Sequence, residues 1–206
     1  MQLRTVMLCT TAILLHSAIA SAAQSIDIDA LKKKIEARSS QYSELVTILE
    51  NEKVDTALAA FDVMVETGDK TLIEMAVSSA LSATDTRLRA RALWEAMSRR
   101  RNFVIEVDTD ALAEQEEGLQ AVRSWFGEQR TFPITNVFAD TQCLNLVSRN
   151  SCYADGNATI SGVKLDIVRG DWLSGSFELA TDGNLRGTIA NPDENSPGYP
   201  ARIVFR

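Results

Sequence analysis

The stretch NATISGVKLDIVRGDWLSGSFELATDGNLRGTIAN, residues 157–191, decides the fold of the second half of the chain. Its runs of alternating or β-forming residues are separated by glycine and Asx turns, a pattern typical of short antiparallel strands. Leu173, Phe177 and Leu179 fall on one face of their strand. The tripeptide Asp-Gly-Asn at 182–184 predicts a hairpin, because such turns need residues that tolerate a positive φ. These features predict a small antiparallel sheet.

The sheet is expected to run to the end of the chain and to begin where the composition changes. The last residues, ARIVFR at 201–206, alternate in the same way. From Pro133 onward glycine, asparagine, threonine and proline are frequent, whereas the preceding hundred or so residues contain few glycines. We place the boundary at 129–136 and predict a helical domain over 24–130, followed by an antiparallel β domain over 131–206. The fold class is therefore α+β.

The first half predicts a series of short helices, because its apolar residues recur at mostly helical spacing. Asp29 is the expected N-cap of the first helix, Gly68 is expected to end the second, and Asp108 or Asp110 is expected near the start of the last. The segments concerned are 27–52, 54–69, 69–83, 84–101 and 108–129.

Two of these segments open alike, with Asp69 followed by Leu72 and Asp85 followed by Leu88. Both continue as alanine-rich helical sequence of similar length. Over residues 54–101 this resembles the helical hairpins of HEAT-like repeats, and the resemblance implies a concave surface that contacts another protein. A plain small helical bundle is the alternative.

Arginines are concentrated on the segment 86–101. Arg87, Arg91, Glu95 and Arg99 are four residues apart in turn and therefore share one helix face. One interpretation is that this face lies beside the acidic stretch that contains Glu114, Glu116 and Glu117 and is neutralised by it, or that both stretches are simply solvated. The other is that Arg87, Arg91 and Arg99 dock an acidic partner or an anionic glycan.

The N-terminal residues 1–23 have the pattern of a cleaved signal peptide. Arg4 is followed by an apolar run from Val6 to Leu15, and small residues lead to Ala20-Ser21-Ala22. The apolar run is too short for a stable membrane anchor. We therefore expect a periplasmic or secreted protein with no membrane span after cleavage. His16, the only histidine of the chain, is lost with this segment.

Cys143 and Cys152 are the only cysteines outside that segment. In an oxidising compartment such a pair normally closes into a disulfide, and the short separation suits an excursion between two strands. A zinc site usually takes four ligands, and a nucleophilic cysteine usually takes an activating histidine. We therefore predict a Cys143–Cys152 disulfide, with no metal and no other cofactor.

Two functions remain open. The chain carries a net charge of −7, which argues against nucleic acid and against anionic membrane surfaces as partners. The favoured hypothesis is an exported, non-enzymatic interaction protein, an adaptor, inhibitor or immunity-type factor, whose helical half docks a protein partner. The alternative is a ligand-binding or hydrolytic module whose β domain holds a sugar or cell-wall fragment through Trp172 and nearby carboxylates.

Overall fold

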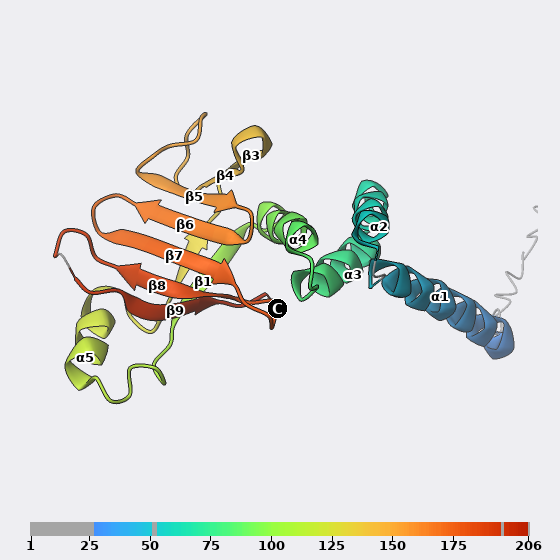
Figure 1. Ribbon diagram of the computed structural model, residues 1–206, viewed down its shortest axis with the longest axis horizontal. Helices are drawn as coiled ribbons and strands as arrows, with labels where there is room; N and C mark the ends of the chain where they lie inside the picture. Colours follow the sequence, from blue (N-terminus) through green and yellow to red (C-terminus); the bar gives the residue numbers. More distant parts are fainter. Residues whose placement is uncertain (1–26, 51–52, 195, 206) are drawn as a thin grey trace, which may run out of the picture. The chain divides into compact units, whose positions relative to one another are not determined.

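The computed structural model describes residues 27–50, 53–194 and 196–205 (Figure 1). The expected signal peptide, residues 1–23, lies outside the described residues. Within them the helices are α1 (Ile28–Leu49), α2 (Val54–Glu66), α3 (Lys70–Leu81), α4 (Thr86–Ser98) and α5 (Glu116–Trp125), and a 3-10 turn, η1, covers Ala139–Thr141. The strands are β1 (Asn102–Val107), β2 (Gln129–Pro133), β3 (Asn136–Phe138), β4 (Cys143–Asn145), β5 (Gly156–Ser161), β6 (Lys164–Arg169), β7 (Leu173–Leu179), β8 (Leu185–Ala190) and β9 (Tyr199–Ile203). The α+β class with N-terminal helices is confirmed, and none of the described helices has the length and apolar content that crossing a membrane requires.

Aspartates begin three of the helices. The Oδ1 atom of Asp27 accepts hydrogen bonds from the backbone N–H groups of Asp29 and Ala30, at 3.1 and 3.0 Å, so Asp27 caps α1 in place of the expected Asp29. Asp69 and Asp85 cap α3 and α4 in the same way. Each of these carboxylates satisfies backbone donors that the first helical turn leaves without partners. The two similar Asp-x-x-Leu segments are therefore similar because both are capped helix starts.

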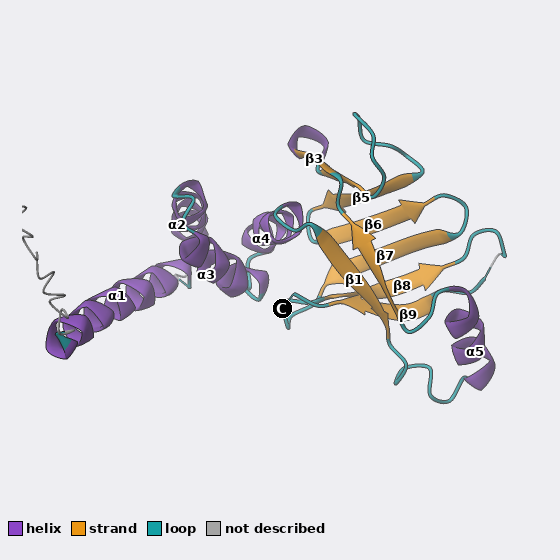
Figure 2. Ribbon diagram, turned by 180° about the vertical axis from the view of Figure 1, so that it is seen from behind, coloured by secondary structure: helices purple, strands orange, loops and turns teal. Residues whose placement is uncertain are grey.

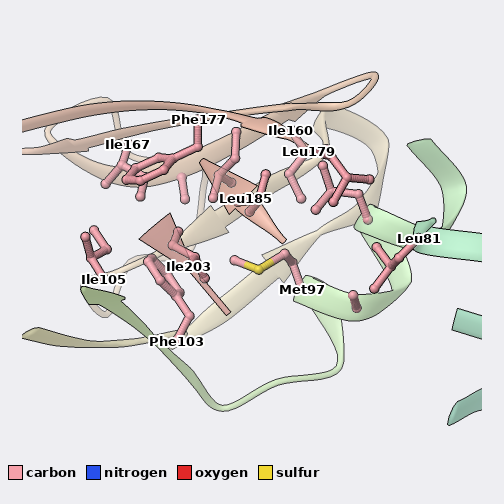
Figure 3. Close-up of a cluster of buried hydrophobic side chains, with 14 of the residues drawn as sticks. Leu81, Met97, Phe103, Ile105, Ile160, Ile167, Phe177, Leu179, Leu185 and Ile203 are labelled. Carbon is pink, nitrogen blue, oxygen red and sulfur yellow. The ribbon is translucent and has the colours of Figure 1, made fainter. Parts of the chain in front are cut away.

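Residues 39–206 form one compact unit, and the helix α1 crosses from the unit 1–38 into it. Within the larger unit, α2, α3 and α4 contact one another pairwise. Their buried residues, such as Phe61, Leu81 and Met97, belong to the same hydrophobic cluster as the interior of the sheet. Figure 3 shows Phe103 and Ile105 across from Phe177 and Ile167, with Met97 and Leu81 at one end of this cluster.

The sheet is antiparallel throughout, and its nine described strands follow the order β2-β1-β9-β8-β7-β6-β5-β4-β3. It is strongly curled (Figure 2). Only Ile134 and Thr135 separate β2, on one edge, from β3, on the other. Ile134 donates to the Arg101 carbonyl and Thr135 donates to the Asn145 carbonyl, both at 2.8 Å. The two-residue connection is therefore hydrogen-bonded both to the residue before β1, near one edge of the sheet, and to β4, near the other edge.

The sheet begins at Asn102, earlier than the boundary expected at 129–136. Strand β1 pairs with both β2 and β9, although the expected boundary places residues 102–107 in the helical domain. Phe103, Ile105 and Val107 are all buried on one side of β1. The last helix accordingly starts at Glu116, whereas Asp108 accepts a hydrogen bond from the Ala111 N–H in the turn before it. Residues 102–107 are therefore held as a strand by β2, which follows after α5, and by β9, almost a hundred residues away.

The hairpin between β7 and β8 forms where the sequence predicts it. Gly183 has a φ of 78°, which glycine adopts readily. The Asp182 carboxylate accepts a hydrogen bond from Arg186 at 2.7 Å and another from the Asn184 N–H at 3.0 Å. These two bonds, the one from Arg186 foremost, lower the pKa of Asp182 to about 2. The strand faces are also as predicted, because Leu173, Phe177 and Leu179 are buried.

Cys143 and Cys152 form the predicted disulfide. Cys143 lies in β4, whereas Cys152 lies in the loop before β5. The fully buried Asn145 organises this loop. Its side-chain amide donates to the carbonyls of Arg149 and Ser151, and its Oδ1 accepts the Tyr153 N–H at 3.0 Å. A disulfide and a buried amide therefore hold the same loop.

Candidate functional site

A cleft of about 530 Å³, which we call the α2/α4 cleft, combines apolar and charged side chains. Four of the lining residues come from helix α2 and four from helix α4. On each helix they are spaced i, i+1, i+4 and i+5, so they form two neighbouring rows along the helix. Two further residues come from turns of the sheet domain. The lining consists of Phe61, Asp62, Val65, Glu66, Ala90, Arg91, Trp94, Glu95, Gln142 and Gly162.

The apolar part of the cleft is centred on Trp94. Phe61 is buried in the core, whereas Trp94 and Val65 are half-buried and pack against that core. A tryptophan that rests on a packed core and still reaches a cleft offers a large, rigid contact surface at low conformational cost. This residue type is enriched among the side chains that dominate protein interfaces.

Charged side chains border the cleft, and several of them form ion pairs. Arg91 of α4 pairs with Asp62 of α2, which joins the two walls of the cleft. Arg99 donates from Nε to Glu95 on its own helix at 2.5 Å. Since the lining holds three carboxylates, those of Asp62, Glu66 and Glu95, against the one guanidinium of Arg91, its net charge is negative.

Within the described residues, Arg87, Arg91 and Arg99 form ion pairs with nearby helical carboxylates, and not with the acidic stretch 114–117 that the sequence offered as their counterpart. Arg87 lies 3.6 Å from a carboxylate oxygen of Asp55 on α2 and 3.7 Å from Asp85. The described ion pairs of Arg87, Arg91 and Arg99 are made with residues of α2, α4 and the α4 cap, and none of them with the stretch 114–117. The three arginine side chains are exposed to solvent, so each pair contributes little to stability.

Gln142 stands at the edge of the cleft in an uncommon backbone conformation. Its φ of 47° is the one positive value for a non-glycine residue in the part of the chain that the structure describes. Its N–H donates to the Ala139 carbonyl and its own carbonyl accepts from the Ile160 N–H, at 3.1 and 2.9 Å. Such residues are uncommon and gather at functional sites, where the surrounding structure holds them in place. Gln142 turns the chain from η1 into the disulfide-bonded strand β4.

Trp172, the other predicted partner-binding residue, does not join the arginines. It lies in the connection between β6 and β7. Figure 1 shows this connection at the end of β6 and β7 that is away from α4. The Arg130 guanidinium lies over the Trp172 ring at 5.0 Å from the centroid, and the Phe132 ring stacks nearly parallel to it at 6.3 Å. Trp125 approaches edge-on at 6.2 Å. Trp172 is half-buried, and its ring contacts these three side chains of the protein.

A second groove, of about 770 Å³, lies among α1, α2, α3 and α4. It has apolar residues such as Leu49, Met75 and Leu88, and acidic ones at Glu50, Glu74 and Asp85. Asp85 is engaged as the α4 cap and Glu74 lies 3.7 Å from Lys70. None of the sequence-predicted site residues lines it.

Sequence reasoning identified Arg91 but missed most of the cleft. Helical spacing already placed Glu95 on the same face as Arg91, and it could also have grouped Trp94, which is three residues from Arg91 on the same helix. Asp62 and Glu66 of α2 come to Arg91 through helix packing, and Gln142 comes through the sheet. No spacing rule relates these segments to one another.

The described residues contain no group of three or more histidine, cysteine, aspartate and glutamate side chains that could hold a metal ion. Comparison with protein-family models, with curated proteins and with solved structures found no match.

Proposed function

We propose that this chain is an exported, non-enzymatic interaction protein that docks a protein partner in the α2/α4 cleft. The observation that carries the proposal is that half-buried Trp94 and the Arg91–Asp62 pair open on one cleft. Tryptophan and arginine are the residue types that most often dominate binding energy, and they do so in pockets flanked by polar side chains.

The charge of the cleft specifies the partner further. Three carboxylates against one guanidinium favour a partner that presents basic side chains around an apolar anchor. This differs from the acidic partner that the arginine run alone suggests, because the carboxylates of α2 already pair with Arg87 and Arg91. The anchor would contact Trp94, and a basic group would face Glu66, because Asp62 and Glu95 already pair with Arg91 and Arg99.

Export is part of the proposal, and it rests on the signal-peptide pattern of residues 1–23. The Cys143–Cys152 disulfide supports it, because such bonds persist mainly in oxidising compartments. The alternative proposal, a sugar or cell-wall fragment held at Trp172, has weaker support, since Arg130, Phe132 and Trp125 already contact that ring.

The test is quantitative capture of a partner from the envelope fraction of the exporting cell. Trp94→Ala and Glu66→Lys should each weaken binding by about tenfold or more, as expected for a central anchor and for a reversed rim charge. Binding of the unmodified chain should weaken as salt rises. Glu66 is exposed on α2, so its variant should remain folded even where Trp94→Ala loses stability.

Arg123→Glu is the matched control, because Arg123 forms a similar exposed pair with Glu128 at 2.7 Å, on α5. It should bind like the unmodified chain. The proposal fails if no protein is captured, or if capture is equal for all variants. It also fails if the captured species is a glycan whose binding depends on Trp172.

A further inference from the structure

Three of the most exposed large apolar side chains of the described residues lie on one face of α1. Ile28, Leu31 and Ile35 are 61, 49 and 59 % exposed. Their spacing of three and four residues places them in one row along the helix. The other such residues, Val63, Val137 and Val168, are on three separate elements. Single exposed apolar residues are ordinary, whereas a row of them indicates an interaction surface.

The row belongs to a heptad pattern that runs through the whole helix. With Ile28 at position a, the a positions are Ile28, Ile35, Tyr42 and Leu49, and the d positions are Leu31, Arg38 and Leu45. Leu45 and Leu49 pack into the hydrophobic core, so the exposed part of the seam is its N-terminal half. Isoleucine at a with leucine at d is the combination that favours parallel, two-stranded coiled coils.

The charges beside the seam fit a second copy of the same helix. In a parallel pair, each g position faces the e position of the next heptad on the partner. Asp27 is at g and Lys32 is at e, so each copy would place Asp27 opposite Lys32 of the partner subunit, twice by symmetry. Lys34, the next g residue, would face Ser39, an uncharged residue. The e and g positions therefore bring opposite charges together, whereas Arg38, at d, would face Arg38 of the partner subunit and is the like-charge contact of the seam.

We propose that α1 pairs with α1 of a second copy of this chain as a short, parallel coiled coil over residues 28–42. This proposal concerns a different surface from the α2/α4 cleft and does not depend on the proposed function. Arg38 interrupts the d positions, and the exposed seam covers only two heptads, so the pairing should be weak and concentration-dependent.

Sedimentation velocity of the full chain over a hundredfold concentration range tests the pairing. The unmodified chain should shift from monomer to dimer as concentration rises. Leu31→Asp, at the centre of the seam, should remain monomeric at every concentration. The control is Val63→Asp, because Val63 is as exposed as Ile28 but lies on α2, and this variant should dimerise like the unmodified chain.

Cross-linking tests the parallel register. Equivalent a positions face each other only in a parallel pair, so Ile28→Cys should form a disulfide between copies, whereas Val63→Cys should not. Lys32→Glu would oppose Asp27 with a like charge and should weaken the dimer at low salt.

Three results would overturn the proposal. The first is a chain that is monomeric throughout, or a dimer that Leu31→Asp leaves intact. The second is a monomer that binds vesicles of anionic lipid only when Leu31 is present, which would assign the seam to a membrane surface. The third is a monomer that Leu31→Asp destabilises to unfolding, which would assign the seam to the chain's own core.

Discussion

The arginines between residues 87 and 101 differ in their use from one residue to the next. Arg87 and Arg91 pair with carboxylates of α2, and Arg99 pairs with Glu95. Arg89 instead donates to backbone carbonyls of the sheet domain, those of Leu179 and Ala180, and also to that of Leu81. Arginines close together in the sequence therefore have two roles: some form ion pairs at the surface, and Arg89 attaches α4 to the sheet.

Arg89→Ala should lower the free energy of unfolding by about 1.5–3 kcal/mol, because it removes the charge-assisted hydrogen bonds from the guanidinium to the carbonyls of Leu179 and Ala180. Arg87→Ala, at an exposed pair on the same helix, should cost less than about 1 kcal/mol. Urea unfolding of the two variants gives the comparison. Equal losses for both variants would mean that Arg89 does not anchor α4.

Single residues also show what local sequence can and cannot reveal about the site. Arg91 is identifiable because helical spacing groups it with Arg87 and Arg99. Trp94 is one turn away on the same helix, yet a lone tryptophan in helical sequence gives no indication of whether it lies in the core or in a cleft. Gln142 gives still less indication, since its positive φ follows from how η1 joins β4.

At the scale of elements, strands that form local hairpins are predictable and strands that pair at long range are not. β5 to β8 follow one another with short turns, and their alternation and the glycine in each turn are visible in the sequence. β1 has the same alternation at Phe103, Ile105 and Val107, but it stands between helices α4 and α5. Its partner β2 lies beyond α5, and its other partner β9 is almost a hundred residues away. The loop between β4 and β5 is held by the buried side-chain amide of Asn145 and by the Cys143–Cys152 disulfide.

Replacing both Cys143 and Cys152 by alanine should lower the free energy of unfolding by roughly 2.5–3 kcal/mol, because the disulfide closes a short loop in the unfolded chain. Chemical denaturation of the two forms measures this difference. Asn145→Ala in the intact disulfide form serves as comparison, since it disturbs the same loop by another route. Two reactive thiols at 143 and 152 in protein isolated from its native compartment would contradict the assignment.

At the scale of the whole molecule, helices α2–α4 and the curled sheet share one hydrophobic core within residues 39–206. The composition change at 129–136 marks the end of most helical sequence, yet the sheet takes its first strand from before it. A shift in composition thus locates a change of secondary structure, and it does not show where a core ends.

Because the core is shared, residues 39–206 should unfold in a single transition. In a Trp94→Phe variant, tryptophan fluorescence follows only Trp125 and Trp172, near the sheet. Far-UV circular dichroism, which follows the helices, and this fluorescence should give coincident denaturation curves. Separate curves, with the helical signal lost before the fluorescence signal, would instead support two independent domains with a boundary near residue 130.

The central claim is that the α2/α4 cleft binds a protein partner, and site-specific photo-cross-linking tests it most directly. A photoreactive amino acid at Glu66, in the cleft, is compared with one at Glu117, an equally charged and exposed position on α5. Exposed to its native envelope, the chain labelled at 66 should cross-link to one protein, and the chain labelled at 117 should not. Cross-linking from position 117 but not from 66 would contradict the account.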